Sequence, residues 1–214
     1  MKIKHLVKVY RGADNRSSLL DVSYPISDAK LPLIIFLHGF KGYKDWGAFP
    51  LLAQYFAENN FVLLKFNFSH NGGTVNEPID FPDLVAFSKN TYSKELEDMN
   101  CIIDFLKNDS ELKQIVDFNR IFLLGHSRGG AIAILSADRF SEIKKIATLA
   151  AVDNLVKRLS NTMSLEEWKL NGLRYIENSR TKQQMPMKYN FVEDLMENRE
   201  KLDVEKACAR LEIP

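Results

Sequence analysis

The residues with the clearest chemical potential are Gly125-His126-Ser127-Arg128-Gly129-Gly130. They form a G-x-S-x-G pattern directly after the apolar run IFLL and directly before a segment rich in Ala, Ile and Leu. A sharp turn between a buried strand and a helix holds such a serine in strained backbone geometry, and the crowding leaves room only for glycine at positions 125 and 129. The hydroxyl of Ser127 is therefore predicted to project above a sheet as a nucleophile.

A second motif, His38-Gly39-Phe40-Lys41-Gly42, follows the first nearly continuous apolar run, LPLIIFL. Acyl transfer passes through a tetrahedral oxyanion, which needs two hydrogen-bond donors. The natural pair is the backbone N–H of Phe40 and that of Arg128, the residue after the serine. An H-G loop alone often just closes a strand, but paired with the Ser127 turn it predicts an oxyanion hole.

Both motifs need a scaffold, and the rest of the chain indicates which one. Short runs of Val, Ile, Leu and Phe predict antiparallel strands at 2–10 and 19–27 and buried strands at 31–38, 61–68, 121–125 and 145–152. Helical patterns lie between them near 49–56, at 92–107 with Ser93 as N-cap, and at 129–139. Strands that alternate with helices indicate an α/β fold with a mostly parallel sheet flanked by helices. Both motifs then lie at the carboxyl edge of that sheet, where ligands bind.

The domain organisation follows from a change in composition. Residues 1–152 are predicted to form the α/β core. Between residues 153 and 206, 20 of 54 residues are charged and no β-rich run appears, so this segment is predicted to be a helical lid insertion. Residues 207–214 are predicted to begin a further core strand, because Leu211-Glu212-Ile213-Pro214 resembles the first residues of one.

Three segments in this order, HGFKG, FNFSHNGG and GHSRGG, make the chain resemble the α/β-hydrolase superfamily over essentially its whole length. Lys44-Asp45-Trp46 and the lid before a final L-x-I-P are similar to small carboxylesterases, including cinnamoyl-esterase-like and dienelactone-hydrolase-like members. The resemblance implies a serine hydrolase that cleaves small-molecule carboxylic esters through an acyl-enzyme on Ser127. It implies no metal and no organic cofactor.

The sequence departs from this superfamily in its catalytic triad, which runs Ser, Asp, His along the chain. All four histidines precede Ser127, and none occupies the family's histidine position: they are His5, His38, His70 and His126. We expect His38 to brace the oxyanion loop and the His126 side chain to point away from the hydroxyl. Asp153 is a conceivable acid, although a residue that opens a lid is more often a helix cap.

The ending and the missing partners together suggest a hydrolase truncated before its last strands, whose complete form supplies Asp and His after Pro214. Impaired activity is expected for the 214 residues, together with an exposed apolar sheet edge that promotes aggregation. Two alternatives stay open. One is a catalytically silent binding protein with this fold, and the other is peptidase, thioesterase or acyltransferase chemistry at the same site.

Composition excludes other classes of function. The 29 Lys and Arg residues balance 28 Asp and Glu residues, so the net charge of +1 provides no field for nucleic acid or acidic membranes. The N-terminus lacks the apolar core of a signal peptide, and no run approaches 18 apolar residues, which predicts a cytoplasmic location. Cys101 and Cys208 fit no metal or disulfide spacing, which suggests a reducing compartment. The oligomeric state is not predicted.

Overall fold

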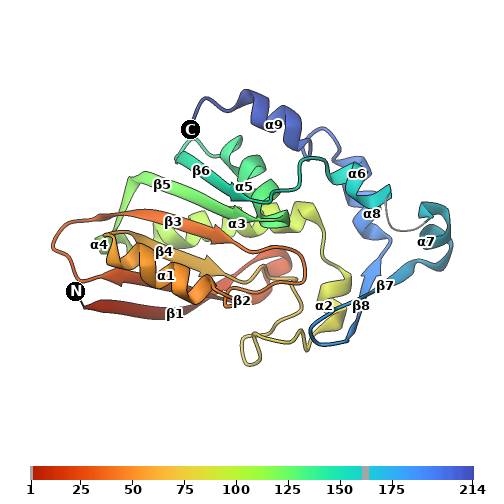
Figure 1. Ribbon diagram of the computed structural model, residues 1–214, viewed down its shortest axis with the longest axis horizontal. Helices are drawn as coiled ribbons and strands as arrows, with labels where there is room; N and C mark the ends of the chain where they lie inside the picture. The colour runs from red at the N-terminus through yellow and green to blue at the C-terminus, as the bar shows by residue number, and fades with distance from the viewer. Residues whose placement is uncertain (1, 161–163) are drawn as a thin grey trace.

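The computed structural model describes residues 2–160 and 164–214. In this part of the chain one central sheet (Figure 1) contains six strands: β1 (Ile3–Arg11), β2 (Ser17–Pro25), β3 (Leu31–Leu37), β4 (Val62–Phe66), β5 (Val116–His126) and β6 (Ile143–Leu149). Their spatial order is β1-β2-β4-β3-β5-β6. β1 pairs with β2 and β2 pairs with β4 in antiparallel orientation, whereas β4, β3, β5 and β6 run parallel to one another. The predicted α/β class with a mostly parallel sheet is confirmed.

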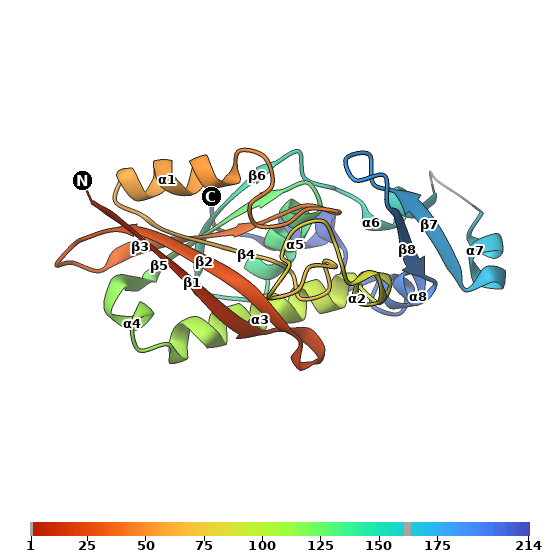
Figure 2. The same ribbon diagram turned by 90° about the horizontal axis from the view of Figure 1, so that it is seen from below.

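Helices cover both faces of the sheet (Figure 2). α1 (Phe49–Glu58) lies on one face, and α3 (Tyr92–Asn108) and α5 (Arg128–Ala137) lie on the other. The buried strand β3 serves both layers, because its side chains alternate. Leu33, Ile35 and Leu37 belong to the large core that includes α3 and α5, while Ile34 and Phe36 belong to a smaller core with α1. This double burial explains the continuous apolar run read from the sequence.

Shorter elements complete the core, and two details of the prediction need correction. The short elements are η1 (Ala13–Asn15), α2 (Leu84–Ser88) and α4 (Leu112–Ile115). The N-cap of α3 is Thr91 rather than Ser93, because the Thr91 hydroxyl accepts the backbone N–H of Lys94. α5 begins at Arg128 itself, directly after the serine.

The predicted helical insertion is not wholly helical. It contains α6 (Leu155–Ser160), α7 (Leu165–Asn171) and α8 (Asn190–Glu197), but also an antiparallel hairpin of β7 (Leu173–Glu177) and β8 (Gln184–Lys188). We call α6, α7, β7, β8 and α8 the cap; it lies beyond the carboxyl ends of the parallel strands (Figure 1). The hairpin packs against α7, where the indole N–H of Trp168 donates to the backbone carbonyl of Met187 at 3.0 Å. Period-2 burial in two five-residue strands, one of them interrupted by Pro186, gives too short a pattern for a strand to be predicted.

The predicted strand at residues 207–214 is also corrected. Residues up to Arg210 belong to α9 (Val204–Arg210), which packs against α5, and the last four residues have no regular structure. Pro214 nevertheless reaches the outer edge of β6, where its carbonyl oxygen accepts the N–H of Ile146 at 3.0 Å. Along the rest of that edge, within the described residues, β6 has no neighbouring strand.

Candidate active site

Ser127 occupies the turn between β5 and α5 in a backbone conformation that L-residues rarely adopt. Its φ is 54° and its ψ is −118°. The turn is fixed on both sides, because the Ser127 N–H donates to Leu149 O at 2.9 Å and its carbonyl accepts from Gly130 N at 3.0 Å. Strain of this kind persists only where the surrounding structure imposes it, and it is concentrated at functional sites.

Two glycines make this turn sterically feasible. A Cβ on Gly125 would lie 2.4 Å from the carbonyl oxygen of Gly129, and a Cβ on Gly129 would lie 2.3 Å from the carbonyl oxygen of Leu37. Both contacts are with backbone atoms, which cannot move aside as a flexible side chain can. The strand and the helix therefore approach so closely that neither position has room for a side chain.

The H-G-x-x-G loop lies directly against this turn. A Cβ on Gly39 would lie only 3.1 Å from the Cβ of Ser127. His38 holds the loop in place, since its Nε2 accepts the N–H of Phe68 at 3.2 Å and its Nδ1 therefore carries the proton donated to Gly39 O at 2.9 Å. Burial lowers the pKa of His38 to about 4, so the ring is neutral and acts as a brace between the segment after β4 and the loop.

The backbone N–H groups of Phe40 and Arg128 have no acceptor among the described residues. For Arg128 this follows from its position, because the first N–H groups of a helix have no intrahelical partner. Arg128 opens α5 and Phe40 belongs to the loop packed on Ser127, so two unpaired donors border the serine. The positive end of the α5 dipole adds to the favourable field for an anion at this point.

The side chains of the same two residues are joined to each other and to the cap. The guanidinium of Arg128 lies 4.1 Å from the ring centre of Phe40, 4.8 Å from that of Tyr92 and 5.0 Å from that of Phe191 in α8. Its Nη1 is 3.3 Å from Oε1 of Glu95, which is buried. The core and the cap thus meet at a cation held between aromatic faces.

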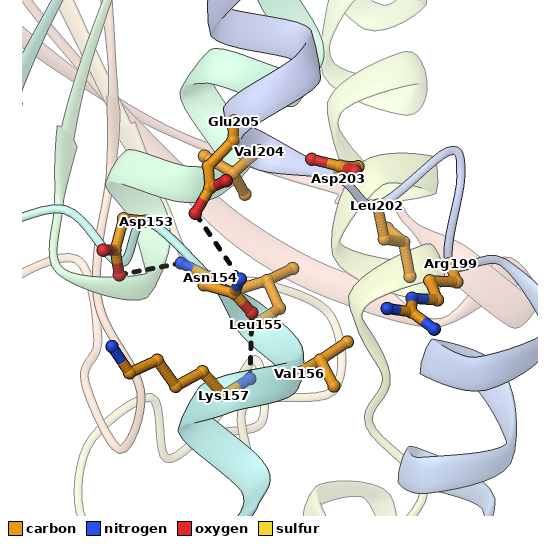
Figure 3. Close-up of a pocket in the computed structure, with 10 residues that line it drawn as sticks. All are labelled: Asp153, Asn154, Leu155, Val156, Lys157, Arg199, Leu202, Asp203, Val204 and Glu205. Atoms are coloured by element: carbon orange, nitrogen blue, oxygen red, sulfur yellow. Dashed lines mark hydrogen bonds between the residues drawn. The ribbon is translucent and has the colours of Figure 1, made fainter.

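Two cavities open beside Ser127. The Trp46 pocket, of about 390 Å³, is lined by core residues that include Phe40, Lys41, Trp46 and Ser127, and by residues 178–180 of the hairpin. The α6 pocket, of about 260 Å³, extends from Ser127 along residues 150–158. A third cavity of about 450 Å³ lies between α6 and α9 (Figure 3) and contains neither Ser127 nor the H-G-x-x-G loop, so we do not assign the site to it.

Solved structures of other proteins share this fold at low sequence identity. No family model matches the sequence, and no curated protein matches it either. Among solved structures, Est1E from Butyrivibrio proteoclasticus aligns over 97% of this chain with a TM-score of 0.69 and 18% identity, and an esterase domain from Rhodothermus marinus aligns over 100% with a TM-score of 0.59 and 18% identity. A hypothetical protein from Pseudomonas aeruginosa aligns over 82% with a TM-score of 0.61 and 19% identity. This chain spans 74%, 74% and 57% of the lengths of these three chains.

The sheet order, the serine turn and these matches agree. The chain has the α/β-hydrolase fold. The sequence resemblance to that superfamily is therefore confirmed at the level of the fold.

His38, His70 and His5 do not pair with Ser127, and each contacts other groups in the core or the outer strands. His38 is a brace, as described above. The ring of His70 contacts Ser69 Oγ at 2.9 Å and Asp14 Oδ2 at 3.2 Å, and burial lowers its pKa to about 4. The ring of His5 contacts Ser23 Oγ at 2.9 Å on the outer strands.

His126 and Asp153 lie near Ser127 but do not complete a triad. The His126 ring stacks on Trp46, with 6.5 Å between ring centres, in the Trp46 pocket. Asp153 is exposed at the α6 pocket, and its Oδ1 accepts from its neighbour Asn154. In residues 2–160 and 164–214, no side chain forms a hydrogen bond with Ser127 Oγ.

Phe49 and Trp46 itself also line the Trp46 pocket. The sequence is compatible with Lys44, Asp45 and Trp46 either lining the entrance or forming a helix-entry loop, and of these three residues it is Trp46 that lines the pocket. Its neighbours Lys44 and Asp45 instead form a charged network with Asp21 and Lys65, in which Lys44 Nζ lies 2.6 Å from Asp21 Oδ2. Asn178 and Arg180 are not predicted as site residues from the sequence; the polar run Asn-Ser-Arg-Thr between two short alternating segments is the one local signal for a hairpin turn there.

Neither a metal site nor a membrane-spanning helix is present in the part of the chain that the structure describes. No three His, Cys, Asp or Glu side chains gather there as metal ligands. No helix there is both long and apolar enough to cross a bilayer.

Proposed function

We propose that this protein is a serine hydrolase that cleaves carboxylic esters through an acyl-enzyme on Ser127. The observation that carries the proposal is the strained Ser127 turn, bordered by the unpaired N–H groups of Phe40 and Arg128. Two of the solved structures similar to this chain support it: one is named an esterase domain, and the other has the name Est1E.

The proposed reaction has two steps. Ser127 Oγ attacks the ester carbonyl carbon, and the N–H groups of Phe40 and Arg128 bind the oxyanion that forms. The bond to the alcohol oxygen then breaks, the alcohol leaves with a proton, and Ser127 carries the acyl group. Water attacks that acyl group, releases the carboxylic acid and returns the proton to Ser127. Loss of one oxyanion donor costs about 3 kcal/mol in such sites.

The proton on Ser127 needs a base, and we infer that none of the four histidines provides it. Each ring is either bound to other partners or stacked on Trp46. The α6 pocket on the other side of Ser127 offers about 260 Å³ for an imidazole supplied from elsewhere. Without that base, only binding and the oxyanion donors remain, which provide about 10³- to 10⁴-fold acceleration over water.

The absence of a base at Ser127 among the described residues also favours a second candidate. An α/β-hydrolase fold that keeps its pocket but has no proton acceptor at the serine would act as a binding protein. The two functions differ in one property, which is whether Ser127 can be acylated or phosphonylated at all.

A labelling experiment tests the proposal. A fluorophosphonate probe should modify the protein at Ser127, located by mass spectrometry, and Ser127→Ala should abolish the modification. Hydrolysis of p-nitrophenyl acetate should be slow, and free imidazole should increase the difference in rate between the native protein and Ser127→Ala.

Three results would change the conclusion. Equal labelling of Ser127→Ala would contradict the nucleophile, and no labelling even with imidazole would favour the binding protein. Rapid turnover without imidazole that Ser127→Ala abolishes would keep the hydrolase but place the base inside this chain.

A further inference from the structure

Three of the polar side chains that line the Trp46 pocket can donate hydrogen bonds to a ligand, and they come from both the core and the cap. Lys41 comes from the oxyanion loop, and Asn178 and Arg180 come from the β7–β8 turn. No carboxylate is among the described residues that line this cavity. A pocket with two cations and no acid favours an anionic ligand.

Lys41 is a cation without a carboxylate partner at hydrogen-bond distance in the described structure. Its Nζ donates instead to the backbone carbonyl of Glu177 at 2.9 Å, which joins the loop to the end of β7. Burial lowers the pKa of Lys41, and a bound anion would raise it again. The residue also has a left-handed backbone with φ of 54°, a conformation that glycine would adopt more easily.

Asn178 provides an independent observation. The residue is only 5% exposed, and its Nδ2 has no acceptor within the described residues. Its Oδ1 already accepts the N–H of Arg180 at 3.1 Å, so the unused atom is a donor. A buried amide donor without an acceptor is costly, and a small shift of the turn that opens Nδ2 to the pocket would let a ligand oxygen satisfy it.

Arg180 is the outermost of the three donors. Its guanidinium pairs with Asp80 at the surface, where the two side chains are 43% and 61% exposed. Exposed pairs of this kind contribute little to stability, so a carboxylate in the pocket can share the guanidinium with Asp80 at small cost.

Aromatic rings form the other wall of the pocket. The rings of Trp46 and His126 are nearly parallel, with an angle of 15° between them, and the ring of Phe49 lies 5.8 Å from that of Trp46. Flat apolar surfaces of this kind pack against a flat apolar body. The cavity of about 390 Å³ is of the size that takes a small organic ligand.

We propose that the Trp46 pocket binds a carboxylate carried on a flat apolar body, and that Lys41, Asn178 and Arg180 hold the carboxylate. The substrate that such a pocket would favour is an ester that also bears a free carboxylate, bound with its ester carbonyl at Ser127. The substrate assignment rests on the proposed function, but binding of the anion does not require a reactive serine.

The test is a binding titration with a matched pair of ligands. Phenylacetate and phenylacetamide are added at constant ionic strength, and the fluorescence of Trp46 is followed, with Trp46→Phe as the check that the signal does not come from Trp168. Phenylacetate is expected to bind about tenfold more tightly than phenylacetamide. Lys41→Met and Arg180→Met should each weaken phenylacetate by about tenfold and leave phenylacetamide nearly unchanged.

The chain offers a matched control in Lys182. Like Lys41, Lys182 has a left-handed backbone, with φ of 60°, and like Arg180 it lies in the β7–β8 turn. Its side chain, however, is 73% exposed and does not line the pocket. Lys182→Met should therefore bind phenylacetate as the native protein does. Thermal melting of each variant establishes that it is folded. If Lys41→Met does not fold, the binding result for Arg180→Met alone decides the test.

The proposal is overturned if the two ligands bind equally, if neither binds, or if Lys182→Met weakens phenylacetate as much as Lys41→Met does. Ser127→Ala should bind phenylacetate normally. Normal binding without fluorophosphonate labelling of the native protein would refute the proposed hydrolase alone, and labelling without selective binding of phenylacetate would refute this proposal alone.

Discussion

Arg128 contributes its backbone N–H to the space beside Ser127 and its side chain to the contact between core and cap. The guanidinium also forms an ion pair with Glu95, a carboxylate that is only 3% exposed. Burial raises the pKa of Glu95, and Arg128 opposes this rise. The residue that opens the helix after the serine is therefore also needed for a stable buried charge.

Arg128→Met should destabilise the protein by about 3 to 5 kcal/mol, because it leaves Glu95 buried without its cation. The loss should depend on pH. A carboxyl with a raised folded-state pKa favours folding most below its unfolded pKa, and stability falls as pH rises toward the folded pKa. Urea unfolding of Arg128→Met should therefore show a steeper decline above about pH 4.5 than the native protein does.

The double variant Arg128→Met/Glu95→Gln serves as the control. It removes the buried charge, so it should recover part of the stability and lose the added pH dependence. A single variant that is as stable as the double variant at every pH would contradict this account of Glu95.

At the scale of elements, one carboxylate ties α3 to two other parts of the core. Asp98 accepts the N–H of Ala13 in η1 at 2.8 Å and the N–H of Ser69, after β4, at 2.7 Å. Despite these bonds, burial raises the pKa of Asp98 to about 7. The junction is therefore expected to respond to pH within the neutral range.

Proton binding by Asp98 determines the direction in which the stability changes with pH. Between the unfolded pKa, about 4, and the folded value, the native state holds a proton that the unfolded chain has released, so stability falls as pH rises through this window and is flat above it. The contribution across the window is about 4 kcal/mol. Asp98→Asn should remove this slope from urea-unfolding free energies, whereas Asp104→Asn, an exposed position on the same helix, should retain it.

Some helices and strands could be predicted from the sequence, and others could not. Long periodic segments such as α3, and doubly buried strands such as β3, carry their pattern locally, and their predicted positions are confirmed within a few residues. The β7–β8 hairpin depends on pairing between two short, charged segments, a non-local property with little local signal. The spacing of two glycines around Ser127 predicted the turn because Gly125 is crowded by Gly129 within the same short segment, whereas the crowding of Gly129 against Leu37 of β3 is a non-local contact. Asn178 and Arg180 reach the pocket only through the way the cap folds over the core, so spacing from Ser127 could not reveal them.

At the scale of the whole molecule, the two outer strands of the sheet differ in protection. The β1 edge carries charged residues along its length, among them Lys4, Lys8 and Arg11, which discourage pairing with another chain. Ala147, Thr148 and Leu149 of β6 are exposed, and beside them lies a groove of about 570 Å³ lined mainly by apolar side chains, Phe122 and Ile146 among them. An apolar groove next to an open edge favours self-association.

The native protein should therefore associate with rising concentration in sedimentation velocity, and Ala147→Lys should shift it toward the monomer by placing a charge in the groove. Val7→Lys provides the control, because Val7 is 67% exposed on the opposite edge strand. Native protein that stays monomeric at every concentration would be evidence against an adhesive β6 edge.

The turn at residues 178–183 is closed by its own hydrogen bonds. Asn178 N donates to Gln183 O at 2.9 Å, and Lys182 N donates to Asn178 O at 2.8 Å. This short segment carries two of the three donors in the Trp46 pocket, whereas Ser127 and the amides of Phe40 and Arg128 belong to the α/β core and its loop, outside the hairpin. Grafting a different six-residue turn onto β7 and β8 should therefore change which ligand the pocket prefers and leave the Ser127 turn intact, so this hairpin is a suitable place to engineer specificity.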